Sequence, residues 1–202
     1  MPGGKTLNST LLDTKTLDFC VDLSREMGIY YQVFFPGSDG DSGINLMTEQ
    51  EGPEREMYRE HTGISIDLVD LKEVFQRPEV KGCLKSMFVG DPESLALLRQ
   101  RLEKHFGGSV YIVQSMENFL EVLSPNASKG QGLRFVLEHL SLKREEVIAF
   151  GDEENDLPMF TVAGFSVAPS NAKDAVKAKA DLVVRSNAED GVAAFLEELL
   201  GV

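Results

Sequence analysis

The sequence predicts an α/β fold in two parts, and two patterns of apolar residues carry that prediction. From residue 124 onward, short apolar runs alternate with helical patterns, as in a parallel sheet covered by helices on both faces. Residues 15–123 instead combine one or two helices with pairs of strands, which is typical of a separate α/β domain. At 202 residues, the chain is long enough for one large or two small domains with a buried core.

The elements of the first part follow from local patterns. Apolar spacing predicts a helix from Leu17 to Met27, and Gly28 is a typical helix end. Residues 29–35 and 44–48 are expected to form two strands, most simply a hairpin over residues 38–43. Further strands are expected at 84–89, 110–113 and 119–123, and helices at 53–61, 68–75 and 92–105.

The hairpin loop contains Asp39 and Asp41, which alternate as the ligands of an EF-hand do. A calcium loop of that type also needs a glutamate at its twelfth position and a helix on each side, and both are missing here. The sequence therefore predicts a plain turn.

The second part begins with a helix for which Ser128 is a suitable N-cap. The apolar run Val147–Phe150 predicts a buried strand, and Gly151 allows the chain to turn sharply at its carboxyl end. Asn155 or Asp156 is expected to cap the helix that follows. The full pattern is helices at 130–140, 156–162, 171–179 and 189–200, with strands at 146–150, 164–168 and 182–184.

Acidic side chains gather directly after the strand at 146–150, at Asp152, Glu153, Glu154 and Asp156. Ligands of parallel sheets bind at the carboxyl ends of the strands, so this loop is where a site is expected. Hard oxygen donors beside an amide suit Mg²⁺. An acidic loop before a helix is more often a solvated cap, and the pattern alone leaves both interpretations open.

Composition narrows the classes of partner and compartment. The net charge of −13 argues against nucleic acid or an anionic membrane as a partner, because both attract basic surfaces. Cys20 and Cys83 form neither a metal-binding spacing nor a disulfide framework, which favours a reducing compartment. No apolar run reaches transmembrane length and no signal-peptide core is present, so we expect a cytoplasmic protein.

Three segments of the second part resemble one known family. The run Gly151-Asp152-x-x-Asn155-Asp156 is similar to the fourth motif of the haloacid dehalogenase superfamily, and of its Cof-type phosphatases in particular. Lys129-Gly130 resembles the family's motif-three lysine at the start of a core helix. Ser186–Val192 resembles the segment that opens the last helix. The resemblance covers about the last 80 residues.

The resemblance implies a division of the chain into three segments. Residues 124–202 would form the C-terminal half of a Rossmann-like parallel-sheet core, and residues 15–123 a large α/β cap of the C2 type. Residues 1–14 would be the remnant of a β-hairpin that joins core and cap. In the family, such a cap sits over the active site and supplies substrate-selecting side chains.

The resemblance also implies a reaction and a set of roles. Family members hydrolyse phosphoric monoesters of small metabolites, such as sugar phosphates, with Mg²⁺ and an aspartyl-phosphate intermediate. Lys129 would be the catalytic cation that binds the phosphate, and Asn155 would donate to the phosphoryl oxygens. Asp152 would be a direct Mg²⁺ ligand and Asp156 a water-mediated partner of the metal.

The sequence departs from the family at the nucleophile. No Asp-x-Asp-Gly-Thr precedes the cap, and the one Asp-x-Asp, Asp39-Gly40-Asp41, falls in the hairpin loop. We therefore expect this chain to be inactive alone, and to self-associate through the strand edge at 147–150 that the missing part would cover. Two hypotheses stay open: a piece of a Mg²⁺-dependent phosphatase, or a non-catalytic binding or interaction module. An in-frame Asp-x-Asp-Gly-Thr upstream of Met1 would decide for the first.

Overall fold

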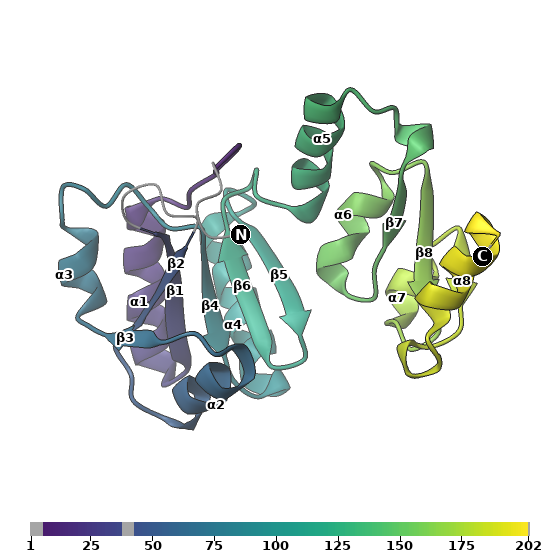
Figure 1. The fold of residues 1–202 in the computed structure, drawn as a ribbon. Helices are drawn as coiled ribbons and strands as arrows, with labels where there is room; N and C mark the ends of the chain where they lie inside the picture. Colours follow the sequence, from purple (N-terminus) through teal and green to yellow (C-terminus); the bar gives the residue numbers. More distant parts are fainter. Residues whose placement is uncertain (1–5, 38–42, 202) are drawn as a thin grey trace. The chain divides into compact units, whose positions relative to one another are not determined.

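The computed structural model describes residues 6–37 and 43–201, which fall into two compact units (Figure 1). The first unit extends to Ala127 and the second begins at Ser128. The predicted turn at Asp39 and Asp41 lies outside the described residues, as does the beginning of the expected N-terminal hairpin remnant, residues 1–5. No helix in the described part of the chain is long and apolar enough to cross a membrane.

The first unit is built on a six-stranded sheet with strand order β3-β2-β1-β4-β6-β5. All neighbouring pairs are antiparallel except β2 and β3, which are parallel. The predicted hairpin of β1 and β2 is confirmed, with Val33 opposite Met47. The strands are β1 (Tyr30–Pro36), β2 (Ile44–Thr48), β3 (Ile66–Leu68), β4 (Lys85–Val89), β5 (Tyr111–Met116) and β6 (Phe119–Leu123).

Four helices belong to this unit: α1 (Thr14–Met27), α2 (Pro53–Thr62), α3 (Leu71–Phe75) and α4 (Pro92–Phe106). Asp13 and Asp91 cap α1 and α4, because each side chain accepts a hydrogen bond from a backbone N–H in the first turn. Gly28 and Gly107 end the same helices in the left-handed conformation, with φ of 65° and 54°. The predicted end of α1 at Gly28 is therefore confirmed, and α4 extends one residue beyond the expected range, 92–105.

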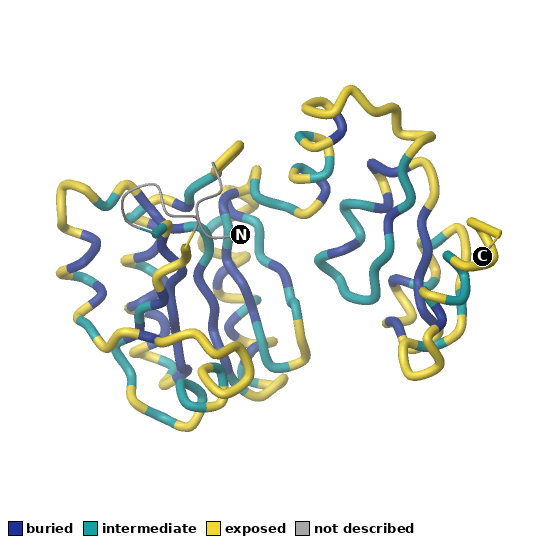
Figure 2. Tube along the Cα trace, in the orientation of Figure 1, coloured by how far each residue is buried: buried dark blue, intermediate teal, exposed yellow. Residues whose placement is uncertain are grey.

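Among the described residues, helices pack on both faces of this sheet: α1, α3 and α4 on one face and α2 on the other. Alternate residues of β1, such as Tyr31 and Val33, pack into the main core with α1, α3 and α4. Tyr30 and Phe34 point to the opposite face and form a smaller cluster with Tyr58 of α2. Figure 2 shows the result as continuous buried stretches along the central strands.

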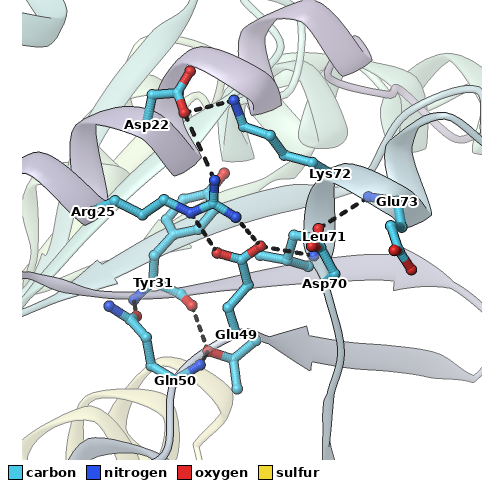
Figure 3. A network of polar contacts seen from close by, with 10 residues as sticks. Asp22, Arg25, Tyr31, Glu49, Gln50, Asp70, Leu71, Lys72 and Glu73 are labelled. Carbon is cyan, nitrogen blue, oxygen red and sulfur yellow. Dashed lines mark hydrogen bonds and ion pairs between the residues drawn. The ribbon is translucent and has the colours of Figure 1, made fainter.

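A polar network at the edge of the first unit joins α1, the end of β2 and α3 (Figure 3). The Arg25 guanidinium donates two hydrogen bonds to the Glu49 carboxylate, at 2.9 and 2.6 Å. The same carboxylate accepts the backbone N–H of Leu71, at the start of α3. Lys72 pairs with Asp22 of α1 at 2.5 Å. These bonds hold elements that are distant in sequence in one arrangement.

Cys20 and Cys83 are both free and buried in the first unit. Burial raises the pKa of the Cys20 thiol to about 12, and raises the pKa of Cys83 well above its ordinary value. The thiolate is the reactive form, so we expect neither cysteine to react with Ellman's reagent in the folded chain. Unfolding in guanidinium should release both thiols together. Rapid stoichiometric labelling of the native chain would contradict the burial of these residues.

The second unit contains a three-stranded sheet of β7 (Ile148–Phe150), β8 (Phe165–Pro169) and β9 (Leu182–Val184). Its order is β7-β8-β9 and both pairs are parallel, as the alternation of strands and helices predicts. Its helices are α5 (Lys129–Leu140), α6 (Leu157–Phe160), α7 (Asp174–Lys177) and α8 (Gly191–Leu200).

Both faces of this parallel sheet carry helices, which confirms a further expectation. Ala149 packs in a cluster with Phe160 of α6 and Val176 of α7. The next residue along β7, Phe150, contacts Phe195 of α8, with ring centroids 5.9 Å apart. Successive strand residues point to opposite faces, so α8 lies on the face opposite α6 and α7.

Three local predictions were wrong in extent. Residues 66–68 form the short strand β3, and the helix expected from residue 68 begins only at Leu71. Helices α6 and α7 have four residues each and are shorter than expected. A 3₁₀ turn at Glu154–Asp156 precedes α6, and the backbone N–H groups of Val162 and Ala163 close onto Met159 in a final turn.

Candidate functional site

A hollow of about 280 Å³ lies in the second unit, where β7 and β8 end. Its polar lining comes from Lys129, Asp152, Asp156 and Asn187. These residues lie at the start of α5, on the loop after β7 and on the segment after β9. The carboxyl edge of a parallel sheet is where ligands of such sheets bind, and this is where the sequence placed a site.

The Asp156 carboxylate accepts three hydrogen bonds at this hollow, and its side chain is only 6% exposed. One carboxylate oxygen, Oδ2, accepts the backbone N–H groups of Asp152 and Glu153 at 3.0 and 3.1 Å. The other, Oδ1, accepts the Lys129 ammonium at 2.5 Å. Asp156 occupies the N-cap position of α6 but makes no side-chain bond to that helix, so the expected capping is wrong. Its oxygens bind the preceding loop and the lysine instead.

Lys129 begins α5, and Ser128 caps this helix as predicted by accepting the Gln131 N–H. The lysine ammonium donates to Asn155 Oδ1 at 3.2 Å as well as to Asp156. Its side chain remains 48% exposed, so part of the ammonium faces the hollow. The structure thus brings together three of the four predicted site residues across 26 and 27 positions of sequence.

Two glycines make this contact possible. A Cβ at Gly130 would lie 2.5 Å from the Pro158 carbonyl oxygen, so only glycine lets α5 approach α6 this closely. A Cβ at Gly151 would lie 2.3 Å from the Asp156 Cβ. Lys129 lies beside Gly130 and Asp152 lies beside Gly151. The close approach that each glycine allows therefore also sets the position of the site residue next to it.

Asp152, the fourth predicted residue, lines the hollow with a carboxylate that has no hydrogen bond or ion pair to any described residue. The neighbouring Glu153 is instead paired with Lys173 at 2.7 Å. Mg²⁺ commonly takes one or two protein carboxylates plus phosphate oxygens and water, so the chemistry of Asp152 fits that ion. Residues 6–37 and 43–201 contain no group of three or more His, Cys, Asp or Glu side chains that could hold a metal.

Asn187 lines the hollow and was not predicted as a site residue. Its backbone N–H donates to Asn171 Oδ1 at 2.8 Å, which joins the segment after β9 to the loop after β8. The resemblance of Ser186–Val192 to a helix-opening segment directed attention to the helix. The sequence contained one signal for Asn187, which is that it follows the third strand of the predicted parallel sheet. The carboxyl ends of parallel strands meet at one edge of the sheet, and Asp152 lies at the same edge.

The model of the haloacid dehalogenase-like hydrolase family matches residues 1–196. The chain belongs to this family. The resemblance inferred from the three motifs is therefore confirmed, and with it the α/β fold of this haloacid dehalogenase-like hydrolase.

Two relatives and one solved structure illustrate what this haloacid dehalogenase-like hydrolase resembles. It is 44% identical over 79 residues to the Bacillus subtilis 5-amino-6-(5-phospho-D-ribitylamino)uracil phosphatase YitU. The matched segment covers 39% of this chain and 29% of YitU. The chain is 43% identical over 77 residues to the phosphoglycolate phosphatase of Methanopyrus kandleri, which covers 38% of this chain and 33% of the relative. A haloacid dehalogenase-like hydrolase from B. subtilis superimposes with a TM-score of 0.77 and 26% identity, over 94% of this chain and 72% of the other.

The haloacid dehalogenase-like chain is shorter than these relatives. The two matched segments cover a third or less of each phosphatase, and a longer match to a Schizosaccharomyces pombe hydrolase reaches 55% of that protein.

Proposed function

We propose that this chain is part of a Mg²⁺-dependent phosphatase that acts on small phosphorylated metabolites such as sugar phosphates. The observation that carries the proposal is the Lys129 ammonium, fixed by Asp156 and Asn155 beside the unpaired carboxylate of Asp152. Relatives named as phosphatases support the same reaction. In this proposal the first unit is the cap, and the second is the C-terminal half of the catalytic core.

The lining of the hollow suits a phosphoryl group. Phosphoryl transfer spreads negative charge over the equatorial oxygens, and catalysis consists mostly of positioning and neutralising that charge. Lys129 offers a half-exposed ammonium, and Asn155 keeps its amide N–H groups for a ligand because Oδ1 accepts from the lysine. Mg²⁺ held by Asp152 would neutralise further phosphate charge.

The intact enzyme would act through an aspartyl-phosphate, and the described residues supply no Asp-x-Asp nucleophile after a core strand. Positioning groups have nothing to position without a nucleophile, so we expect the 202-residue chain to show no turnover of p-nitrophenyl phosphate. Sustained phosphate release by the purified chain, lost in Asp152→Ala, would contradict this expectation.

The proposal is tested on the whole open reading frame that contains these residues, assayed with p-nitrophenyl phosphate and a panel of sugar phosphates. Asp152→Asn should lower Mg²⁺-stimulated turnover by at least about 100-fold, because it removes a carboxylate ligand of the Mg²⁺ that would neutralise the phosphoryl charge. Glu153→Gln removes the same charge from the same loop, where the carboxylate is paired with Lys173, and should have little effect. Equal losses in both variants would count against Asp152 as a metal ligand. No turnover from the whole reading frame would favour the alternative, a non-catalytic binding module.

We also propose that the protein is cytoplasmic. Both cysteines of the described chain are free and buried, which is usual in a reducing compartment.

A further inference from the structure

The hollow is short of positive charge for a phosphate ligand. Lys129 contributes the positive charge of its polar lining, and Asp156 neutralises it at 2.5 Å. Asp152 adds an unpaired negative charge. Mg²⁺ at Asp152 would offset that charge, and a phosphate monoester still needs hydrogen-bond donors for its other oxygens in addition to the lysine.

Asn187 is the further neutral donor in this lining. Asn187 lines the hollow, and its side chain makes no hydrogen bond to any described residue, so both amide N–H groups are available. Its backbone is fixed, since its own N–H bonds to Asn171 Oδ1 at 2.8 Å. The backbone that carries this amide is thus held in place before a ligand arrives.

We propose that Asn187 contacts the ligand by donating a side-chain hydrogen bond to an oxygen of the bound phosphoryl group, and that Asn171 is the residue that positions it. This inference rests on the proposed function, because it assumes that the hollow binds phosphate. It assigns a binding role to the segment after β9, in addition to the residues at β7 and α5.

The test is a titration of the ¹⁵N-labelled 202-residue chain with inorganic phosphate at constant MgCl₂, followed by the amide cross-peaks. The side-chain NH₂ pair of Asn187 is identified by its absence from the spectrum of Asn187→Asp. In the unmodified chain this pair should shift with phosphate, together with the amides of Asp152 and Asn155. Asn187→Asp should weaken phosphate binding at least about 10- to 100-fold, because it removes a hydrogen bond to a charged group and adds a negative charge that repels phosphate. Asn187→Ala removes the donor without adding a charge, and should weaken binding about 10-fold or more. Asn118→Asp makes the same chemical change in the first unit, outside the lining, and should leave the affinity unchanged.

The outcomes separate the inference from the proposed function. Shifts at Asp152 and Asn155 with a stationary Asn187 pair and an unchanged affinity of Asn187→Asp would overturn the inference and keep phosphate binding. No phosphate-dependent shift anywhere would overturn the inference, which requires this hollow to bind phosphate, while the turnover of the whole reading frame decides the proposed function.

The positioning role of Asn171 has its own readout. Asn171→Ala removes the acceptor of the Asn187 backbone N–H, so that cross-peak should move upfield and phosphate affinity should fall. Asn171→Asp retains an acceptor oxygen and should restore the downfield position of the cross-peak. An Asn187 N–H signal that is the same in all three proteins would refute the positioning role.

Discussion

The 202-residue chain should sediment as dimers or larger assemblies that dissociate on dilution. Within the described chain, β7 and β9 each pair only with β8, so both edges of this three-stranded parallel sheet carry unpaired backbone groups. Parallel sheets of this kind are normally covered on every side. The second unit also exposes large apolar side chains, each of which forfeits up to about 1.5–3 kcal/mol of burial free energy. They are Val136, Leu140, Leu142, Phe165, Leu182, Val183, Leu199 and Leu200.

The role of the β7 edge is tested by placing a charge on it. Ile148→Lys should shift the sedimentation profile toward monomer, because a lysine on an edge strand opposes pairing with another strand. Val183→Lys places the same residue on β9, the other edge strand, and a shift as large as that of Ile148→Lys would show that association does not depend on β7 in particular. Circular dichroism checks that both variants remain folded. A wild-type monomer at all micromolar concentrations, with slow amide exchange along Val147–Phe150, would show that this edge is already protected.

Asp156→Ala should lower the free energy of unfolding of the second unit by about 3–5 kcal/mol. The substitution leaves two backbone N–H groups, those of Asp152 and Glu153, without their acceptor, and removes the partner of Lys129. All tyrosines lie in the first unit and the chain has no tryptophan, so aromatic signals would miss this change. Hydrogen exchange at the amides of β8, whose residues 166–169 are buried, reports the free energy of unfolding of this unit.

Two further variants show whether the loss comes from these bonds. Asp156→Asn keeps one acceptor oxygen but loses the charge, and should give an intermediate loss of stability. Asp174→Ala removes an aspartate whose side chain is 99% exposed on α7, and should change stability by no more than about 0.5 kcal/mol. A single neutral hydrogen bond contributes about 1 kcal/mol to stability. If the free energy of unfolding of Asp156→Ala lay within about 1 kcal/mol of wild type, the three bonds of this carboxylate would not stabilise the unit as expected.

Elements with strong local signals could be predicted from the sequence. The end of α1 at Gly28 and the hairpin of β1 and β2 follow from glycine and apolar patterns within one short window. Strand β3 could not be predicted, because three residues are too few to show an alternation of apolar and polar side chains. Its extended conformation depends on parallel pairing with β2, about 20 residues earlier in the sequence. The helix expected at 156–162 is shorter for a related reason: packing of Phe160 and Ala163 into the sheet cluster decides where it ends.

The candidate site divides in the same way. The motifs identified Lys129, Asp152, Asn155 and Asp156, and the structure brings three of them into direct contact, while their catalytic roles remain proposals. The backward turn of Asp156 onto its own loop was not predictable, since a carboxylate before a helix ordinarily caps that helix. Asn187 joins the hollow only through the order of three parallel strands, which no local pattern contains.

The clamp on Lys129 has a consequence for the thermodynamics of ligand binding. A free lysine side chain loses up to about 1.5–2 kcal/mol of rotamer entropy when it is ordered. Here Asp156 and Asn155 order it in the unliganded chain, so that loss belongs to folding and not to association. An arriving anion meets an ammonium that needs no reorientation, and association should carry a correspondingly smaller entropic penalty.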